Sequence, residues 1–224
     1  MFNNFDAKKI SFLLTCHNRK EKTYNCLCSL FKVLPDAKVY LVDDGSTDGT
    51  SEMITSCFPS VNLINGVGNL FWSRGMRKAW SEANKYGYDF FIWLNDDLIL
   101  YDYFLEELFD CYYSTNPNSI ITGIIIDRNT KEVIYGGYDK EGRLIQIDGN
   151  MHLAHEMNGN VVLVPKCVVD VIGIIDSKFH HTGGDTDYGY TAKENNIQVL
   201  TTKRAVAEGY INHLDRIHKW GTNI

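Results

Sequence analysis

Short apolar blocks alternate with longer amphipathic ones along the first half of the chain. Runs typical of strands lie at residues 9–15, 38–42, 61–64 and 90–94. Segments with helical spacing or helix-starting turn residues follow them at residues 23–33, after Thr50, at 70–83 and at 103–111. This repeated alternation predicts an α/β fold, with a Rossmann-like, doubly wound, mostly parallel sheet and helices on both faces.

The pattern changes after Pro117. Residues 120–126, 132–135 and 161–164 have strand character, and short helices are predicted at residues 168–172 and 188–195. We therefore expect a smaller half of mixed or antiparallel strands beside the first. No linker or repeat separates the two, so we expect a single domain over residues 1–224, with halves at 8–115 and 116–215 and a tail at 216–224.

Composition and charge exclude several classes of protein. Hydrophobic residues are 44% and charged residues 22%, an ordinary globular balance. The net charge of −6 disfavours a nucleic-acid partner, so a bound phosphate needs a metal or a few Arg and Lys residues. Six cysteines without a CxxC pair indicate reduced thiols in the cytoplasm. We expect no signal peptide and no transmembrane segment, although docking at the inner face of a membrane stays open.

A pair of adjacent acids interrupts the stretch FFIWLNDDLIL at residues 90–100. Burying an ionised carboxylate is costly unless it is paired, hydrogen-bonded or bound to a metal. Ligands of open α/β sheets gather at the carboxyl ends of strands, which is where Asn95, Asp96 and Asp97 are expected. The stretch therefore predicts either a site for a divalent cation and an anionic ligand or a plain acidic turn.

Polar residues also end the first two predicted strands. Neighbouring strands of a doubly wound sheet would bring together, around one crevice, Thr15, Asn18, Arg19, Asp43 and Asp44. An acid there can accept hydrogen bonds from a pyrimidine base or a ribose, and Arg19 can face a phosphate. The glycine fingerprint of dinucleotide-binding proteins and the Walker phosphate loop are both missing from the sequence, which disfavours a dehydrogenase or a P-loop enzyme.

Four motifs in order and spacing resemble glycosyltransferase family 2, namely TCHNR, VDDGSTDGT, WLNDD and GGDTDYGYTAKENN. The family comprises inverting sugar transferases of the GT-A fold, and the resemblance spans roughly residues 8 to 215. The segment GNLFWSRGMRKAW further resembles bacterial rhamnosyltransferase-like members. The resemblance implies a UDP- or dTDP-linked sugar donor bound by the first half, and a divalent metal, Mg²⁺ or Mn²⁺. It also implies a saccharide or lipid-linked saccharide acceptor on the second half, in bacterial surface polysaccharide synthesis.

By this resemblance, the base and the ribose are held by Thr15, Asp43 and Asp44. Asn95-Asp96-Asp97 matches the family's DXD-type metal motif, with asparagine in place of the first acid. Asp97 is then the expected direct metal ligand, and Asp96 faces sugar or ribose hydroxyls. Mg²⁺ and Mn²⁺ prefer hard oxygen ligands, often one or two carboxylates completed by phosphate and water.

The segment Gly183-Gly184-Asp185-Thr186-Asp187, just before the predicted helix, matches the motif that supplies the family's general base. Inversion requires a carboxylate that deprotonates the acceptor hydroxyl during attack. Asp185 is the expected base, and Asp187 is the alternative or a supporting residue. Both acids could instead only stabilise the start of the helix.

Other residues carry weaker expectations. The donor pocket is expected to include Trp72 and Arg74, although Trp72 could equally be core packing. Asn158 is expected on the acceptor side. A late histidine completes the metal shell in several GT-A enzymes, which makes His213 a candidate ligand. Further candidates for phosphate, acceptor or metal contacts are His180, His181, Arg216 and Lys219.

Two other functions are alternatives. A nucleotidyltransferase that makes sugar nucleotides also uses acids and a metal, but it usually opens with a glycine-rich phosphate loop, and CHNRK has the basic residues without the glycines. A non-catalytic nucleotide-sugar-binding protein of the same fold would be expected to have lost the metal or base positions. Both acidic motifs are present in this sequence.

Overall fold

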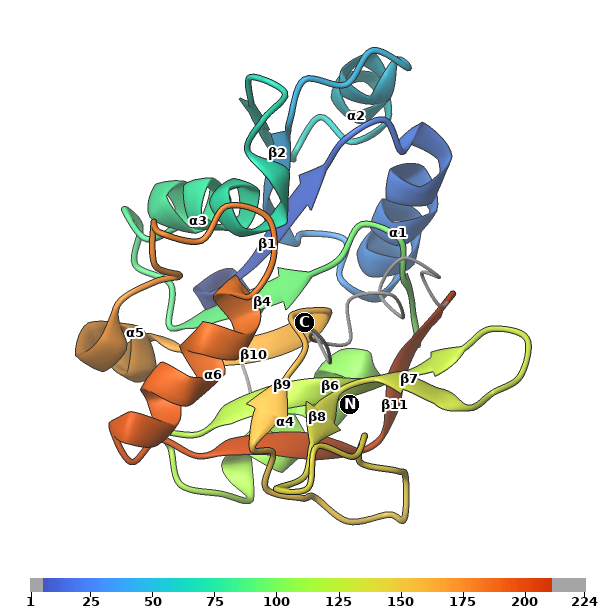
Figure 1. Cartoon of the computed structure of the whole chain (residues 1–224). Helices are drawn as coiled ribbons and strands as arrows, with labels where there is room; N and C mark the ends of the chain where they lie inside the picture. The colour runs from blue at the N-terminus through green and yellow to red at the C-terminus, as the bar shows by residue number, and fades with distance from the viewer. Residues whose placement is uncertain (1–5, 211–224) are drawn as a thin grey trace, which may run out of the picture.

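Within residues 6–210, the part of the chain that the computed structural model describes, nine strands form one sheet (Figure 1). Its order is β3-β2-β1-β4-β10-β6-β11-β5, with β7 paired to β6, while β8 and β9 form a small second sheet. The strands are β1 (Ile10–Cys16), β2 (Lys38–Asp43), β3 (Asn62–Asn65), β4 (Phe90–Leu94), β5 (Ile99–Leu100), β6 (Ile120–Asp127), β7 (Val133–Tyr135), β8 (Gly137–Tyr138), β9 (Glu156–Met157), β10 (Val161–Pro165) and β11 (Val199–Gly209). After a 3-10 turn at Ala7–Lys9, the helices are α1 (Lys20–Val33), α2 (Thr50–Cys57), α3 (Phe71–Ala83), α4 (Phe104–Tyr113), α5 (Lys166–Ile172) and α6 (Gly184–Glu194).

The first four strands are parallel, which confirms the predicted doubly wound α/β half. The chain runs from β1 through β2 to β3 toward one edge and then returns to place β4 on the other side of β1. The carboxyl ends of β1 and β4 therefore lie at a topological switch point, where open α/β sheets bind their ligands.

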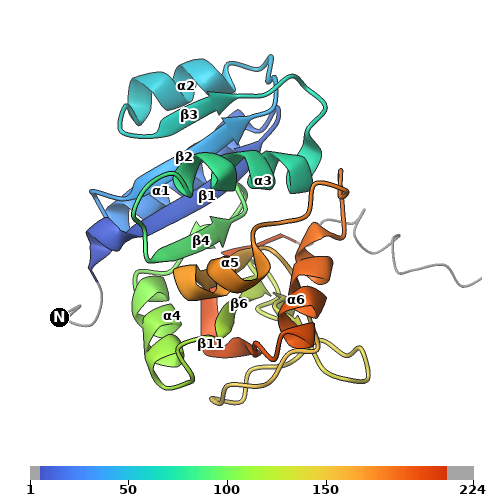
Figure 2. The same cartoon turned by 90° about the vertical axis from the view of Figure 1, so that its left-hand side faces the viewer.

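Helices cover both faces of the sheet. Figure 2 shows α3, α5 and α6 on the same side, and they share one apolar core, while α1, α2 and α4 share the other. On β4, Ile92 and Leu94 belong to the core under α1, whereas Phe91 and Trp93 belong to the core under α3. A strand buried on both faces is apolar at every position, which explains the continuous apolar run of β4. Between residues 6 and 210, none of the helices has both the length and the apolar character to cross a membrane.

The second half continues the same sheet with strands of mixed direction, as predicted. β10 lies antiparallel between β4 and β6, so the two halves are joined by backbone hydrogen bonds. β11 is parallel to β6 and antiparallel to the short β5. The core therefore extends without interruption from one half to the other.

The longest strand, β11, was not predicted from the sequence. Its register shifts between Thr201 and Ala207, which breaks the strict alternation of a regular strand. It also carries the adjacent cations Lys203 and Arg204. The buried carboxylate of Glu107 accepts hydrogen bonds from the Lys203 N–H at 2.8 Å and from Nε of Arg204 at 2.7 Å. A partner on α4, distant in the sequence, therefore stabilises this stretch.

Close packing of α3 on β1 leaves no room for a side chain at Gly75. A Cβ there would lie 2.8 Å from Cβ of Thr15 and closer still to its Oγ1. We expect Gly75→Ala to lower the free energy of unfolding by about 1–2 kcal/mol, because overpacking outweighs the gain in helix propensity. Thermal unfolding should then begin about 2–8 °C lower. Gly87→Ala is the control, since a Cβ at Gly87 meets nothing within 4 Å. Equal unfolding temperatures for the two variants would contradict this packing.

Candidate functional site

The polar ends of β1, β2 and β4 meet at the switch point of the sheet. β1 and β4 are paired in parallel, with Leu13 opposite Trp93, so the residues that follow the two strands are neighbours. The first turns of α3 and α6 and the start of β10 reach the same region (Figure 1). Most of the residues predicted to form a site therefore lie close together.

Asp96 and Asp97 face the start of α1. Nη1 of Arg19 lies 3.0 Å from Oδ1 of Asp96 and 3.1 Å from Oδ2 of Asp97. The hydroxyl of Thr23 donates to Oδ2 of Asp96 at 3.0 Å, and Nζ of Lys22 lies 3.8 Å from Oδ2 of Asp97. Burial raises the pKa of Asp96 to about 6, and Arg19 opposes this rise. The carboxylates of Asp96 and Asp97 thus lie next to the positive charges of Arg19 and Lys22.

Asp97 is the more accessible of the two acids, with 23% of its side chain exposed against 5% for Asp96. Among residues 6–210, no group of three or more His, Cys, Asp or Glu side chains is arranged to hold a metal ion. The oxygen donors present fit a different arrangement, in which Mg²⁺ or Mn²⁺ takes one or two carboxylates and completes its shell with phosphate and water. The predicted ligand His213 lies outside the described residues, together with Arg216 and Lys219.

The side-chain amide of Asn95 joins the two halves of the sheet. Its Oδ1 accepts a hydrogen bond from Nε1 of Trp72 at 2.8 Å, and its Nδ2 donates to Oδ1 of Asn160 at 2.7 Å. The backbone N–H of Asn95 donates to the carbonyl of Asn160 at 2.9 Å. An amide offers both a donor and an acceptor, whereas a carboxylate offers acceptors alone. This pairing explains an asparagine at the first position of the acidic motif.

Asp185 lies in the first turn of α6, opposite the start of β10. Its Oδ2 accepts a hydrogen bond from the N–H of Gly159 at 2.8 Å. A Cβ at Gly159 would lie 2.5 Å from the indole of Trp72 and 3.1 Å from Cβ of Asp185, so Gly159 packs closely against both side chains. Burial raises the pKa of Asp185, and the hydrogen bond from Gly159 opposes this effect. Trp72 therefore connects Asp185 to Asn95 and the acid pair.

Asp187 lies in different surroundings from Asp185. Its Oδ1 lies 3.3 Å from Nζ of Lys178, and it borders a polar hollow of about 490 Å³ that Arg77 and Asp176 also line. The predicted start of the helix at residue 188 was wrong, because α6 begins at Gly184 and contains both acids in its first turn. The two acids are thus separated in space.

Asp44 fixes the loop that leads into α3. It is 4% exposed, and its carboxylate accepts hydrogen bonds from the backbone N–H groups of Gly68 at 2.8 Å, Leu70 at 2.7 Å and Phe71 at 3.0 Å. These bonds hold Phe71 at a φ of 53°, which is rare for a bulky residue. The carboxylate thus satisfies donors of the protein itself, and its predicted contact with the donor base stays a prediction.

Asn18 and Asp43 tie together the loops after β1 and β2. The N–H of Asn18 donates to Oγ of Ser46 at 2.8 Å, and its Oδ1 accepts from the N–H of Thr47 at 2.7 Å. Asp43 accepts from the N–H of Ser46 at 2.9 Å. The hydroxyl of Thr15 lies against α3. These residues border the predicted crevice, and their contacts with a donor stay predictions.

Arg74 and Asn158 lie at the margin of the site. Arg74 is exposed, and its backbone N–H donates to the carbonyl of His180 at 3.4 Å. The N–H of Asn158 donates to the carbonyl of Gly136 at 2.9 Å. Asn158 thus continues the pairing of β8 with β9, and its role toward an acceptor stays a prediction.

Four residues enter the site without a specific role having been predicted for them, namely Lys22, Thr23, Gly159 and Asn160. Asn160 carried a usable signal, because a polar residue directly before an apolar strand is buried and needs a partner. Gly159 gave no such signal. Its closeness to Trp72 and Asp185 arises only when α3, α6 and β10 are brought together.

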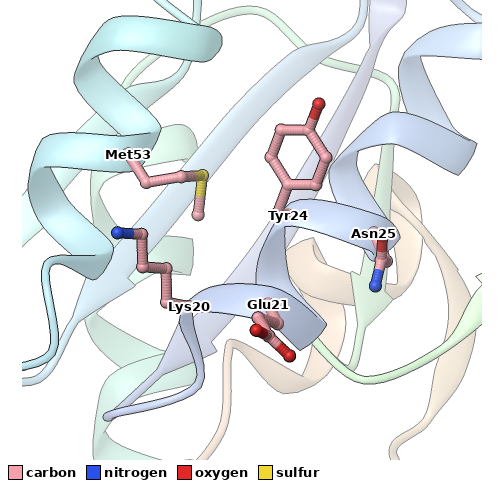
Figure 3. A pocket seen from close by; sticks show the side chains of 5 residues that line it. All are labelled: Lys20, Glu21, Tyr24, Asn25 and Met53. Carbon is pink, nitrogen blue, oxygen red and sulfur yellow. The ribbon is translucent and has the colours of Figure 1, made fainter.

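A second hollow lies between α1 and α2 (Figure 3). It has a volume of about 400 Å³ and is lined by Lys20, Glu21, Tyr24, Asn25 and Met53. α1 and α2 cover the face of the sheet opposite to α6. Its lining contributes a single carboxylate, so it does not provide the paired acids that a metal and a general base require.

A family model described as Glycosyl transferase family 2 matches residues 11–164. The chain is 29% identical, over 132 residues, to a poly-beta-1,6-N-acetyl-D-glucosamine synthase of Staphylococcus epidermidis. That match covers 56% of this chain and 30% of the relative. The chain therefore spans less than a third of the length of this curated relative.

Two solved structures are similar in fold. A crystal structure of GalNAc-T7 with UDP, GalNAc and Mn²⁺ has a TM-score of 0.71 at 17% identity, and the match covers 91% of this chain and 44% of that one. A crystal structure of S. aureus TarS 1-349 has a TM-score of 0.66 at 14% identity, over 90% of this chain and 60% of that one. The mixed α/β domain with its mostly parallel sheet is thus the GT-A fold.

We expect Asp44→Asn to destabilise the protein. An amide keeps one acceptor oxygen and directs its NH₂ group toward backbone N–H groups of the loop, which leaves a buried donor unpaired at a cost of about 1–3 kcal/mol. The midpoint of thermal unfolding should fall by about 2–10 °C. Asp102→Asn is the control, because the Lys32 and Asp102 side chains are 67% and 70% exposed, and such pairs contribute little. Equal unfolding temperatures for the parent and Asp44→Asn would show that the loop does not depend on this carboxylate.

Proposed function

Because the chain belongs to glycosyl transferase family 2, we propose that it transfers a sugar from a nucleoside-diphosphate donor to a hydroxyl acceptor with inversion of configuration. One observation carries the proposal. The partly buried Asp185 lies across Gly159 and Trp72 from the motif Asn95-Asp96-Asp97. One acid is thus available for the acceptor proton, and a separate acid pair is available on the diphosphate side.

The diphosphate of the donor would lie beside Asp97 at the start of α1, where Arg19 and Lys22 provide positive charge. Asp97, with Asp96 behind it, would hold Mg²⁺ or Mn²⁺. When bound, the cation neutralises charge on the leaving diphosphate. UDP and Mn²⁺ in the GalNAc-T7 structure support a UDP-linked donor, with a dTDP-linked one as the alternative. Base and ribose contacts are proposed for Thr15, Asp43 and Asp44.

Asp185 would act as the general base of a single displacement. The acceptor oxygen attacks the anomeric carbon from the face opposite to the diphosphate, while a carboxylate oxygen of Asp185 takes the hydroxyl proton. The bond between the anomeric carbon and the phosphate oxygen breaks, and the nucleoside diphosphate leaves with the bonding electron pair. The N–H of Gly159 orients the carboxylate, and the raised pKa makes it a stronger base than an ordinary aspartate.

The acceptor is proposed to be a saccharide or a lipid-linked saccharide, and the process surface polysaccharide synthesis at the cytoplasmic side. The name of the S. epidermidis relative supports a polysaccharide product. Family membership disfavours a nucleotidyltransferase. Intact acids at both the metal and the base positions disfavour a purely binding role.

A panel of UDP, dTDP, GDP and CDP tests donor binding by thermal shift, each with Mn²⁺ and with EDTA. We expect one nucleotide to raise the unfolding temperature only with Mn²⁺, because a ligand that binds the native state stabilises it by mass action. Asp97→Ala should abolish the metal-dependent rise in unfolding temperature, whereas Asp102→Asn should retain it. Folded parent protein that responds to no nucleotide would overturn the proposed function.

Asp185→Asn should lower kcat by about 10²–10⁴-fold, the usual contribution of a general base, while the nucleotide shift is retained. Asp187→Asn is the matched control and should change kcat by less than about tenfold, because Asp187 pairs with Lys178 instead. Similar losses in both variants, or a loss only in Asp187→Asn, would contradict the assignment of the base.

The pH profile gives a separate test. Asp185 must be ionised to accept a proton, and burial raises its pKa, so activity should fall as the pH drops through that raised value. The apparent pKa of the acid limb of the kcat/KM profile should therefore lie above about 3.9, the ordinary pKa of an aspartate. An acid limb at or below that value would show that the base is not a buried carboxyl group.

A further inference from the structure

We propose that Phe71, His180 and His181 form an aromatic platform on which a pyranose ring of the acceptor lies beside Asp185. This inference rests on the proposed function and names the chemistry of its acceptor site. It concerns the connection between α5 and α6, which Figure 1 shows reaching the start of α3.

The three rings form one cluster on the surface. The ring of Phe71 is stacked on that of His181, with centroids 4.8 Å apart and planes at 21°, and it meets His180 edge-on at 4.9 Å. Phe71 is 45% exposed, and both histidines are exposed as well. A single exposed apolar residue is ordinary on a protein surface, but a cluster of three aromatic rings is of the kind found where ligands bind. Stacking covers one face of Phe71 and one face of His181, so a ligand would lie on the outer face of this stacked pair, with His180 beside it.

The ring of Phe71 is exposed although the backbone of this residue is strained. Phe71 has a φ of 53°, and the buried carboxylate of Asp44 holds its N–H at 3.0 Å. A bulky residue in this region costs of order 1–3 kcal/mol, and such strain persists where the surroundings enforce it, often at ligand-binding sites. The protein thus tolerates strain in a residue whose ring is presented to solvent.

Hydrogen bonds fix the two histidines relative to α3 and to the loop before it. Nε2 of His180 donates to the carbonyl of Asn69 at 2.6 Å, and the hydroxyl of Ser73 donates to the carbonyl of His181 at 3.2 Å. A Cβ at Gly184 would lie 2.8 Å from Oγ of Ser73, so the backbone just before Asp185 also rests on α3. The platform is therefore held firmly and leads directly into the turn that carries the base.

A pyranose ring matches this surface. One of its faces is lined by C–H groups, while its hydroxyls point outward around the rim. Aromatic faces are electronegative and attract polarised C–H groups, and imidazole nitrogens can bond to hydroxyls at the rim. An acceptor hydroxyl must come within about 2.6–3.2 Å of the base, so the saccharide has to lie next to the turn of Asp185. The diphosphate of the donor is assigned to Arg19 and Lys22, which leaves the platform for the acceptor.

Saturation-transfer NMR tests the platform without requiring turnover. The probes are methyl glycosides of N-acetylglucosamine, galactose, glucose and rhamnose, with UDP and the diamagnetic cation Mg²⁺ present. We expect at least one glycoside to bind the parent, and its dissociation constant to rise about 3–10-fold in Phe71→Gly and in His181→Ala. Glycine adopts positive φ readily, so Phe71→Gly removes the ring without disturbing the fold. Tyr113→Ala is the control, because Tyr113 is 48% exposed and lies on α4 at the other face.

The outcomes separate this inference from the proposed function. Two results would overturn the platform alone. One is that Phe71→Gly and His181→Ala bind the glycoside as tightly as the parent does. The other is that no glycoside binds although UDP with Mn²⁺ still stabilises the protein. A third outcome would also overturn the platform. If the sugar of a UDP-hexose receives saturation in the parent but not in Phe71→Gly, while binding of the acceptor glycosides is unchanged, the rings belong to the donor site. Loss of the nucleotide response in the parent would remove the proposed function itself.

Discussion

The site depends on one constraint, which is that each buried or partly buried carboxylate packed around this sheet must be matched by hydrogen-bond donors. An unpaired buried charge would cost several kcal/mol, so the chain supplies donors from segments far apart in the sequence. Asp44 holds the loop before α3, Asp96 holds the start of α1, Glu107 holds β11, and Asp185 holds the start of β10. The pairings of Asp44, Asp96 and Asp185 fix the segments around the switch point in place, and the shape of the site follows from them.

The parallel half of the fold could be predicted because its strands are buried on both faces and its helices on one. Continuous apolar runs and helical spacing therefore appear directly in the sequence. β11 could not be predicted in this way. Its register is irregular, and its two adjacent cations are stabilised by Glu107 of α4. A strand stabilised by a distant partner has no local signature.

The sequence predicted which residues belong to the candidate site more completely than it predicted how their side chains are directed. Asp185 and Asp187 could not be told apart while the helix was expected to start at residue 188. With α6 beginning at Gly184, the two acids are both helical and two positions apart, so their side chains face different directions. One meets Gly159 and the other meets Lys178. The direction of Asn95 depends on Trp72 and Asn160, which only the folded sheet brings near.

The first turn of α3 connects the two sides of the proposed reaction. Trp72 and Phe71 are consecutive, yet the indole of Trp72 lies against Gly159 inside the site while the ring of Phe71 lies outward on the histidines. The direction of both rings follows from the backbone at Phe71, whose N–H is held by Asp44 at the end of β2. A donor base that contacts Asp44 would therefore act on the same hydrogen bonds that orient the rings beside Asp185. If that proposed contact is made, binding on the donor side and the shape of the acceptor side would be linked through one buried carboxylate.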